Sequence, residues 1–512
     1  YAYHYIPKLQ KYLRYGIHDL LGKGIVYTNA YHAHGIPETT PGHHAISTAT
    51  LPKDHGAILN QWFDRHYKKV AYDHDPSPDA AVLNQAPGQV PQGKSGKKTR
   101  VDGLSDQFIL SSNSKQTNKV FALSLKSYPA ISTANRLGKA IWFDDVTGNF
   151  TSSKAYFSEL PAWVSEYNKR SKLSKLTHTT WNLVYPTTHA AYNFPNTRNY
   201  DYCALSFSMI TRRHIPIDHS AVSPYDLFIK TPQASEELLG LTKYCIDQNL
   251  NKASDRLLIW ISLSNLDLLT HFYGPDSLET TDLIYHLDKQ IYDFIGSIQR
   301  RVGEKNCLFV LTADHGICPI PEIAAKQGLG LAKRIMAKPL TEKLNSLIEK
   351  KHGVAGVLKA FEPTFFMFNR ELMASLPEQT KTTIINDLKQ QLIQTEGIKA
   401  VWTAEELMHN SFQPEQLEYF YKTQLFKTRS GDLFCMPEPY CQITHYPTGT
   451  SHLSPYEYDT HVPLVLYQKS YLQKRVIDQK VWIPQLPVTL AQILHIKRPA
   501  ASIYQPLPGV ND

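Results

Sequence analysis

Two runs of apolar residues in the middle of the chain have the length and continuity of strands that are buried on both faces. They cover residues 257–263 and 308–312, and almost every position in them is hydrophobic. Between them, apolar residues recur at steps of three and four positions: Leu283, Leu287, Ile291, Phe294 and Ile298. This spacing forms one face of a helix. The pattern therefore predicts a strand, helix, strand crossover of the kind that builds parallel sheets in α/β folds.

Weaker versions of the same pattern occur towards both ends of the chain. The ranges that predict further elements are 7–21 (helix), 25–27 (strand), 43–50 (helix), 462–467 (strand) and 490–496 (helix). Together with the central crossover, they predict an α/β fold with a mostly parallel central sheet and helices on both faces.

Two long segments fit this sheet poorly, because they have weak periodicity and many turn-forming or aromatic residues. Each returns the chain to a strand of the sheet, and we see no internal repeat. We therefore interpret both as insertions that cover the active face. The predicted division is a catalytic core of residues 1–129, 251–324 and 446–512, with insertions at 130–250 and 325–445.

Composition and charge are those of an ordinary globular protein. The chain has 512 residues, of which 42% are hydrophobic and 20% charged. No run reaches the roughly 18 apolar residues that a membrane span needs. The net charge of +8 would favour anionic substrates, but the basic residues form no stripe, so nucleic acid is not an expected partner. We interpret the basic cluster as a solvated loop; it consists of Lys94, Lys97, Lys98 and Arg100.

The six cysteines are too few for a disulfide framework in so long a chain. Cys435 and Cys441 flank a turn that contains proline, and the pattern leaves two states open for them. They could pair in an oxidising compartment, or they could be buried thiols. The state of the remaining four is also open: Cys203, Cys245, Cys307 and Cys318.

Carboxylates and imidazoles occur where the predicted strands begin or end. Asp267 and His271 are four residues apart just after the first apolar run, so one helical turn would place them on the same side. Asp314 and His315 follow the second run directly, at the carboxyl end of a strand, where open α/β sheets bind ligands. His461 precedes the last predicted strand. Taken singly, Asp267 and His271 fit surface residues better and a lone His461 fits a structural role, whereas the position of Asp314 and His315 favours a metal site. Together they have the nitrogen and oxygen ligands of a two-zinc site.

Thr39 lies at the N-terminal edge of the helix predicted at 43–50. A hydroxyl at this position faces backbone N–H groups that can hold an anion, and a metal ion would convert it to an alkoxide. The local sequence alone favours the alternative of a plain N-cap.

Five segments, read together, resemble one family. They are residues 38–43 (Glu38-Thr39-Thr40-Pro41-Gly42-His43), 53–60, 267–271, 314–316 and 458–463. In this order they resemble the alkaline phosphatase superfamily, in its Thr-nucleophile branch of PafA-like alkaline phosphatases and type I phosphodiesterase/nucleotide pyrophosphatases. The resemblance implies an alkaline-phosphatase-like fold and a phosphoric ester hydrolase that acts on a small-molecule phosphate ester. We expect a monomer.

The resemblance also implies a role for each matching residue. Thr39 would attack phosphorus and form a phosphothreonine, while Asn60 would donate to a phosphoryl oxygen. The implied ligands of two zinc ions are Asp267, His271 and His461 for one ion and Asp314, His315 and the Thr39 oxygen for the other. The family begins with a strand that ends in another zinc-binding Asp, which would precede Tyr1. We therefore expect a longer natural chain, with a signal peptide and a periplasmic or secreted location.

The substrate preference rests on Lys126 and Tyr128. The monoesterase branch presents a Lys-x-Arg pair to the phosphoryl group, and here Lys126 is kept but Tyr128 takes the Arg position. An Arg fork donates two parallel hydrogen bonds to a phosphate, whereas Tyr offers one neutral donor. We predict hydrolysis of phosphate monoesters, with Asn60, Lys126 and Tyr128 binding the substrate. The alternatives are a phosphodiesterase or nucleotide pyrophosphatase, and a noncatalytic phosphate or metal binder. A sulfatase is disfavoured, because the Cys/Ser-x-Pro-x-Arg motif is absent.

Overall fold

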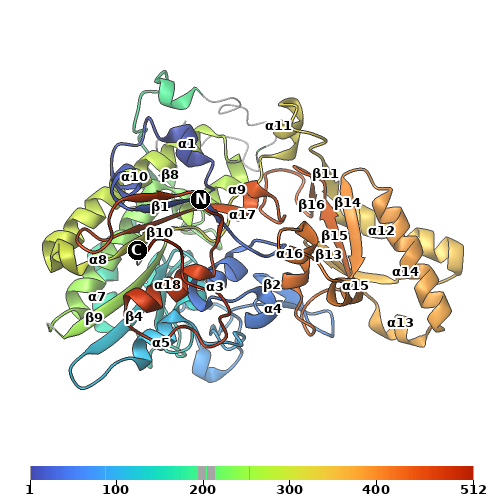
Figure 1. Cartoon of the computed structure of the whole chain (residues 1–512), viewed down its shortest axis with the longest axis horizontal. Coiled ribbons are helices and arrows are strands. Elements are labelled where there is room, and N and C mark those ends of the chain that lie inside the picture. Colours follow the sequence, from blue (N-terminus) through green and yellow to red (C-terminus); the bar gives the residue numbers. More distant parts are fainter. Residues whose placement is uncertain are drawn as a thin grey trace.

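The computed structural model shows a large α/β body and a smaller lobe beside it (Figure 1). It describes residues 2–86, 88–171, 173–193, 203, 214–252 and 254–510. Parts of the insertion predicted at 130–250, namely residues 172, 194–202 and 204–213, therefore lie outside the described residues. Among the helices in the described ranges, none is both long enough and apolar enough to cross a bilayer.

One sheet of the body joins the two ends of the chain. Its strands, in spatial order, are β10 (Phe309–Leu311), β17 (His461–Tyr467), β1 (Ile25–Tyr31) and β18 (Arg475–Ile477), with β19 (Val481–Trp482) also paired to β1. Strand β17 is antiparallel to both β1 and β10, whereas β18 and β19 are parallel to β1. The last predicted strand is thus present as β17, and it makes this sheet mixed.

The second sheet of the body is the parallel one. Its strands, in order, are β6 (Asn149–Thr151), β5 (Lys139–Asp144), β4 (Thr117–Ser124) and β9 (Asp255–Ser262). Strand β4 is parallel to β5 and β9, and only β6 is antiparallel to its neighbour. Since β5 and β6 fall within residues 130–250, the range that we predicted as an insertion also supplies two strands of the body.

A cavity separates the facing edges of the two sheets. Among the described strands, β9 pairs only with β4 and β10 only with β17. A cavity of about 1080 Å³ runs along both strands. Their apolar side chains are therefore half-buried, and not fully buried within one sheet as predicted. Thr39, Lys126, Asp267 and Asp314 also line this cavity, which thus reaches the predicted site.

Helices cover both faces of the body (Figure 1). On one side, α10 (Leu278–Val302) packs against α2 (Gly16–Lys23) and α8 (Pro232–Asn249). Elsewhere in the body, α3 (Thr39–Thr48) packs against α6 (Ser127–Ala134), and α6 contacts β4 and β5. These contacts hold the first turns of α3 and α6 close together, at the carboxyl end of β4.

The helix predicted at residues 7–21 is broken into α1 (Tyr5–Leu9) and α2. The cause is Asp288 of α10, whose carboxylate accepts hydrogen bonds of 2.7–3.3 Å from the backbone N–H groups of residues 14, 15, 17 and 18. These N–H groups donate to Asp288 and not to carbonyls one turn earlier, so α2 begins there. The apolar face predicted for α10 packs inward as expected, with four residues buried and Ile291 half-buried.

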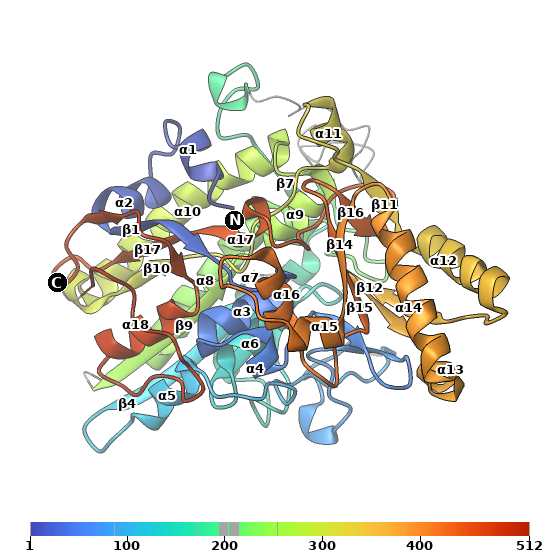
Figure 2. The same cartoon turned by 45° about the vertical axis from the view of Figure 1, so that its right-hand side comes forward.

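The smaller lobe, which Figure 2 brings forward, contains most of the segment predicted as the second insertion. Its antiparallel sheet has the order β12 (Leu358–Glu362), β13 (Phe365–Phe368), β15 (Leu433–Pro437) and β14 (Ile398–Thr403). Helices α12 (Ala337–His352) and α14 (Glu378–Ile393) share an apolar core with this sheet. Glu362, at the end of β12, reaches the body and lies 2.8 Å from the ammonium group of Lys69.

The six cysteines are all buried thiols, which answers the question that the sequence left open. Cys435 and Cys441 are not linked, and the sulfur of Cys441 accepts a hydrogen bond of 3.2 Å from the backbone N–H of Lys333.

Candidate metal centre and nucleophile

Three side chains near the carboxyl end of β9 meet at a spacing that suits a metal ion. Asp267 and His271 lie one turn apart on α9 (Asn265–Tyr273), and His452 comes from a distant loop. Oδ1 of Asp267 lies 3.2 Å from Nε2 of His271 and 3.3 Å from Nε2 of His452, and the two Nε2 atoms are 3.2 Å apart. Ligand atoms of a tetrahedral zinc ion, each about 2.0–2.1 Å from the metal, stand about 3.3 Å from one another. These three atoms already have that spacing.

Hydrogen bonds direct the Nε2 lone pairs of both imidazoles into this cluster. Nδ1 of His271 lies 2.8 Å from the carbonyl oxygen of Thr450, and Nδ1 of His452 lies 2.8 Å from that of Pro37. A carbonyl oxygen only accepts, so each Nδ1 carries a proton, and a neutral ring then has a bare Nε2. Two lone pairs and a carboxylate oxygen at this distance repel one another unless a cation or a proton lies between them. Metal-bound histidines are commonly oriented by such Nδ1 donors, so the residues fit a metal ion.

His461 does not lie in this cluster. The prediction that His461 supplies the third imidazole is therefore wrong, and His452 takes that place. Nε2 of His461 lies 2.7 Å from the carbonyl oxygen of Thr28 and donates to it. The His461 ring stacks between Tyr3 and Tyr31, with centroids 4.2 and 4.3 Å away. As the first residue of β17, His461 is held by the β-ladder opposite Tyr31. It therefore has a structural role.

A second group of ligands lies beside the first. Asp314 follows β10, and its Oδ2 lies 3.3 Å from Nε2 of His315 and 3.1 Å from Nδ1 of His43. Nδ1 of His315 donates to the next carbonyl oxygen of the chain at 2.8 Å, so its Nε2 faces Asp314 and, at 3.8 Å, Asp267. The rings of His315 and His452 stack with centroids 3.5 Å apart. The two ligand groups are thus adjacent parts of one centre.

Burial and neighbouring charges act in opposite directions on the pKa values of this centre. Burial alone would raise the pKa of Asp267 and of Asp314, but the groups around them, led by Lys126 for Asp267 and by His315 for Asp314, lower both below the ordinary range. Burial lowers the pKa of His315 to about 3, so this ring is neutral. For His271, burial lowers the pKa and Asp267 raises it, with a net increase. Two carboxylates and a neutral imidazole are the protonation states that bind a metal cation.

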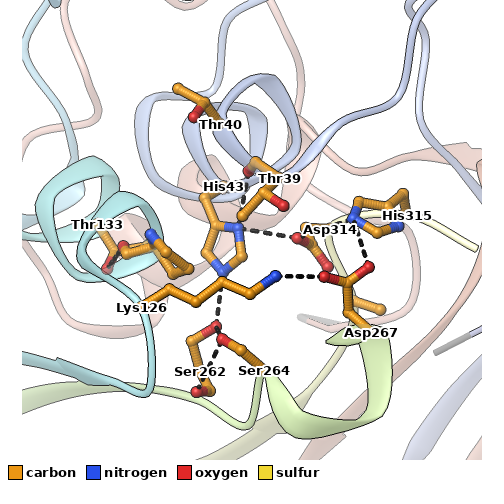
Figure 3. A network of polar contacts seen from close by, with 12 residues as sticks. Thr39, Thr40, His43, Lys126, Thr133, Ser262, Ser264, Asp267, Asp314 and His315 are labelled. Atoms are coloured by element: carbon orange, nitrogen blue, oxygen red, sulfur yellow. Dashed lines mark hydrogen bonds and ion pairs between the residues drawn. The ribbon is translucent and has the colours of Figure 1, made fainter. Parts of the chain in front are cut away.

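Thr39 lies in the first turn of α3, next to this centre. Its side chain is buried, and its carbonyl oxygen accepts a hydrogen bond of 2.8 Å from Nδ1 of His43. The capping position of α3 is Glu38 and not Thr39, which argues against the plain N-cap favoured by the local sequence. Figure 3 shows Thr39 and Asp314 on the same side of His43, whose Nε2 lies 3.0 Å from the hydroxyl of Ser262.

Of the predicted phosphoryl-binding residues, Lys126 lines the same cavity as Thr39 and Asp267. Lys126 forms an ion pair with Asp267 (Figure 3). Oδ1 of Asn60 accepts hydrogen bonds from Thr40, the residue after the predicted nucleophile. Tyr128 lies in the first turn of α6, and burial raises the pKa of its hydroxyl, so this group is neutral.

Lys94 is not simply part of a solvated loop, as we had interpreted it. Its ammonium group forms an ion pair with the buried carboxylate of Asp73 and a hydrogen bond of 2.9 Å with the hydroxyl of Ser127. It also lies 5.7 Å from the centre of the Tyr128 ring. A cation is thus held beside the residue that takes the Arg position.

Sequence reasoning missed His452, although the chain carried a signal for it. His452 stands in a loop of small and hydroxylated residues, Gly449-Thr450-Ser451-His452, nine positions before His461. A loop residue is free to reach a ligand, whereas a residue at the start of a strand is fixed by its ladder. That difference between the two histidines is visible in the sequence.

Two adjacent groups of nitrogen and oxygen ligands, next to a buried threonine at a helix N-terminus, define a metal-dependent hydrolase of phosphate esters. The family model described as type I phosphodiesterase / nucleotide pyrophosphatase matches residues 2–463. The chain belongs to the type I phosphodiesterase/nucleotide pyrophosphatase family, and it is a phosphoric ester hydrolase by that membership. The predicted family resemblance is confirmed.

Relatives of this chain are bacterial alkaline phosphatases. Alkaline phosphatase PafA of Elizabethkingia meningoseptica is 25% identical over 520 residues, which cover 100% of this chain and 92% of the relative. Alkaline phosphatase PhoV of Synechococcus elongatus is 25% identical, with 96% and 88% covered.

Solved structures confirm the predicted alkaline-phosphatase-like α/β fold. The crystal structure of wild-type alkaline phosphatase PafA is similar to this chain with a TM-score of 0.85 and 22% identity, over 99% of this chain and 96% of the other. Murine ectonucleotide pyrophosphatase/phosphodiesterase 5, captured with AMP, has a TM-score of 0.53 and 12% identity, over 99% and 94% of the two chains.

Proposed function

We propose that this chain hydrolyses phosphate monoesters with two zinc ions, through a covalent phosphothreonine at Thr39. The observation that carries the proposal is the tetrahedral spacing of ligand atoms from Asp267, His271 and His452, with a second ligand group and a buried hydroxyl beside them. The similarity to PafA and PhoV supports the same activity, since both of these relatives are named alkaline phosphatases.

The residues of the site divide between two metal positions. One ion would be held by Asp267, His271 and His452, and the other by Asp314 and His315 together with the Thr39 oxygen. When bound, such a pair of ions activates the hydroxyl, neutralises phosphoryl charge and stabilises the leaving oxygen. Imidazole nitrogens and carboxylate oxygens in this number favour zinc among the common divalent ions.

The reaction of the chain's own residues has two halves. In the first, the Thr39 oxygen loses its proton and forms a bond to phosphorus, while the bond from phosphorus to the ester oxygen breaks. The alcohol leaves with that electron pair and takes up a proton. In the second, a water oxygen loses a proton and forms a bond to phosphorus, and the bond from phosphorus to Thr39 breaks; the Thr39 oxygen takes up a proton and phosphate is released. Asn60 and Lys126 donate hydrogen bonds to the nonbridging oxygens in both halves, where negative charge builds up.

A phosphodiesterase is the second candidate, and Tyr128 is the observation that favours it. Its neutral hydroxyl offers one donor, which suits the single negative charge of a diester better than the two charges of a monoester. Lys126, and Lys94 beside the Tyr128 ring, favour the monoester through their positive charge. Initial rates on p-nitrophenyl phosphate and its bis-ester decide the matter. We expect the monoester to be faster, and a strong preference for the bis-ester would replace our choice.

Replacing the nucleophile tests the mechanism. Thr39→Ala should abolish turnover and leave the fold and the metal at Asp267 in place, while Thr39→Ser keeps a hydroxyl and should retain part of the rate. Retained turnover in Thr39→Ala would remove this residue from the mechanism. A chain that holds fewer than two metal ions and shows no turnover with added zinc would instead be a noncatalytic binder.

We propose a periplasmic or secreted monomer as the working form. Fractionation of the native host and light scattering of the purified protein test these two points, and a cytoplasmic pool or a dimer mass would contradict them.

A further inference from the structure

The side chain of Asn60 is held by residues that the proposed mechanism does not use. Its Oδ1 accepts a hydrogen bond of 2.8 Å from the backbone N–H of Thr40 and one of 2.6 Å from the Thr40 hydroxyl. The carboxylate of Glu38 accepts the backbone N–H of Asn60 at 2.6 Å. Since Glu38 and Thr40 flank Thr39, the segment that carries the nucleophile also holds Asn60.

These bonds decide which way the Asn60 amide faces. A backbone N–H only donates, so the amide atom that lies 2.8 Å from the Thr40 nitrogen must be the oxygen. The Thr40 hydroxyl donates to the same oxygen, which fixes the amide plane by a second bond. With Oδ1 committed to Thr40, Nδ2 is turned away from the backbone of α3. The donating end of the side chain therefore remains for another acceptor, which in the proposed mechanism is the phosphoryl group on Thr39.

Glu38 fixes the main chain that carries this amide. It occupies the capping position of α3, and its own carbonyl oxygen accepts the backbone N–H of Gly42 at 2.9 Å. Its carboxylate reaches across to Asn60, the residue before β2 (Gln61–Phe63). Burial raises the pKa of the Glu38 carboxyl to about 7, and at 2.6 Å its hydrogen bond with the Asn60 N–H is short for an N–H donor. Glu38 thus ties the first turn of α3 to the strand that follows Asn60.

We propose that Glu38 and Thr40 are positioning residues, which hold the Asn60 amide so that Nδ2 donates to the phosphoryl group on Thr39. The inference rests on the proposed function, because it assigns Asn60 that contact. It differs from a general structural role in one respect: the effect of Glu38 on the reaction passes through the Asn60 side chain and vanishes when that side chain is removed.

A double-mutant cycle with p-nitrophenyl phosphate tests this dependence. Glu38→Ala removes the acceptor, and we expect kcat/KM to fall about 10- to 100-fold, the usual cost of leaving a partly buried donor without its acceptor. In the background of Asn60→Ala, the same change should cost less than about 3-fold, because no amide is left to position. Thr40→Val removes one of the two donors to Oδ1 and should lower kcat/KM about 3- to 10-fold. In the Asn60→Ala background it should likewise have almost no effect on kcat/KM. The loss should fall on kcat more than on KM, since the contact strengthens as charge develops.

Matched variants separate the hydrogen bond from other effects. Glu38→Gln keeps an oxygen that can accept the Asn60 N–H, and Thr40→Ser keeps the hydroxyl, so both should remain within about 3-fold of the native chain. Glu362→Gln removes a nearby carboxylate that pairs with Lys69, and it should leave the rate unchanged. Unfolding midpoints of all variants show whether a loss of rate reflects a loss of fold.

Three results would overturn the inference. They are an unchanged rate in Glu38→Ala, an equal loss with and without the Asn60 side chain, and a loss in Glu38→Gln as large as in Glu38→Ala. Failure of the proposed function gives a different pattern, in which Asn60→Ala has the native rate or the native chain has none. In a chain without turnover, the same cycle measured as the Kd for inorganic phosphate still tests the positioning: the coupling between Glu38 and Asn60 should persist, and additive effects would refute it.

Discussion

Replacing His452 should weaken metal binding, whereas replacing His461 should lower the stability of the fold. His452→Ala removes a nitrogen that lies 3.2–3.3 Å from the other two ligand atoms of its cluster. Loss of a residue that only orients a metal ligand weakens binding about 10- to 100-fold, so loss of the ligand itself should weaken zinc binding more than about 100-fold. Turnover should fall with it. The fold should survive, because His452 stands in a loop.

His461→Ala should instead leave the metal in place and destabilise the body. Each of the two aromatic contacts of this ring contributes about 0.5–1.5 kcal/mol, and its hydrogen bond to Thr28 adds about 1 kcal/mol. The free energy of unfolding should therefore fall by about 2–4 kcal/mol. His461→Phe keeps the stacking and should recover roughly two thirds of this loss. Burial lowers the pKa of His461, so the ring is neutral and its one N–H is committed to Thr28.

The assay is zinc content per chain together with competition against a chromogenic chelator, run beside urea unfolding of the same samples. We expect His452→Ala to lose about one ion and His461→Ala to keep the native content. A chain that keeps its zinc without His452, or loses it without His461, would refute the assignment of the third ligand.

Three further predictions concern stability. Asp288→Asn should lower the free energy of unfolding by about 2–4 kcal/mol, because the charged acceptor of four backbone N–H groups at the start of α2 is lost; unchanged hydrogen exchange in α2 would contradict this. Chelation should lower the thermal midpoint, because an ion bound only by the folded chain at 1,000 times its Kd adds about 4 kcal/mol, and added zinc should restore it; an unchanged midpoint would speak against a bound metal. Lys351 and His352 lower the pKa of Asp387, so its stabilising contribution is complete above the unfolded pKa of about 3.9 and is lost as the pH falls through the folded value. Asp387→Asn should therefore destabilise the chain at neutral pH, and the loss should shrink as the pH falls below about 3.9 towards the folded pKa; an effect that stays the same over this range would refute the ion pair.

Much of the fold could be predicted because its signals are local. The apolar runs at 257–263 and 308–312 correspond to β9 and β10, and the spacing between them gave the buried face of α10. The helix predicted at 7–21 failed for a reason that no local pattern contains. Its N–H groups bond to Asp288, which lies about 270 residues further along the chain.

The site residues also fall into those that local sequence determined and those that only tertiary contacts decided. Asp267 and His271 share one helical turn, and Asp314 and His315 are consecutive, so local geometry fixes each pair and the sequence by itself determined both. The choice of His452 over His461 was decided only by the tertiary structure, and so was the direction of the Asn60 amide. Both depend on where distant segments meet: His452 contacts His271 across 181 positions, while the ladder of β17 turns His461 onto Thr28. Spacing along a chain fixes distances within a turn or a strand, and packing fixes the rest.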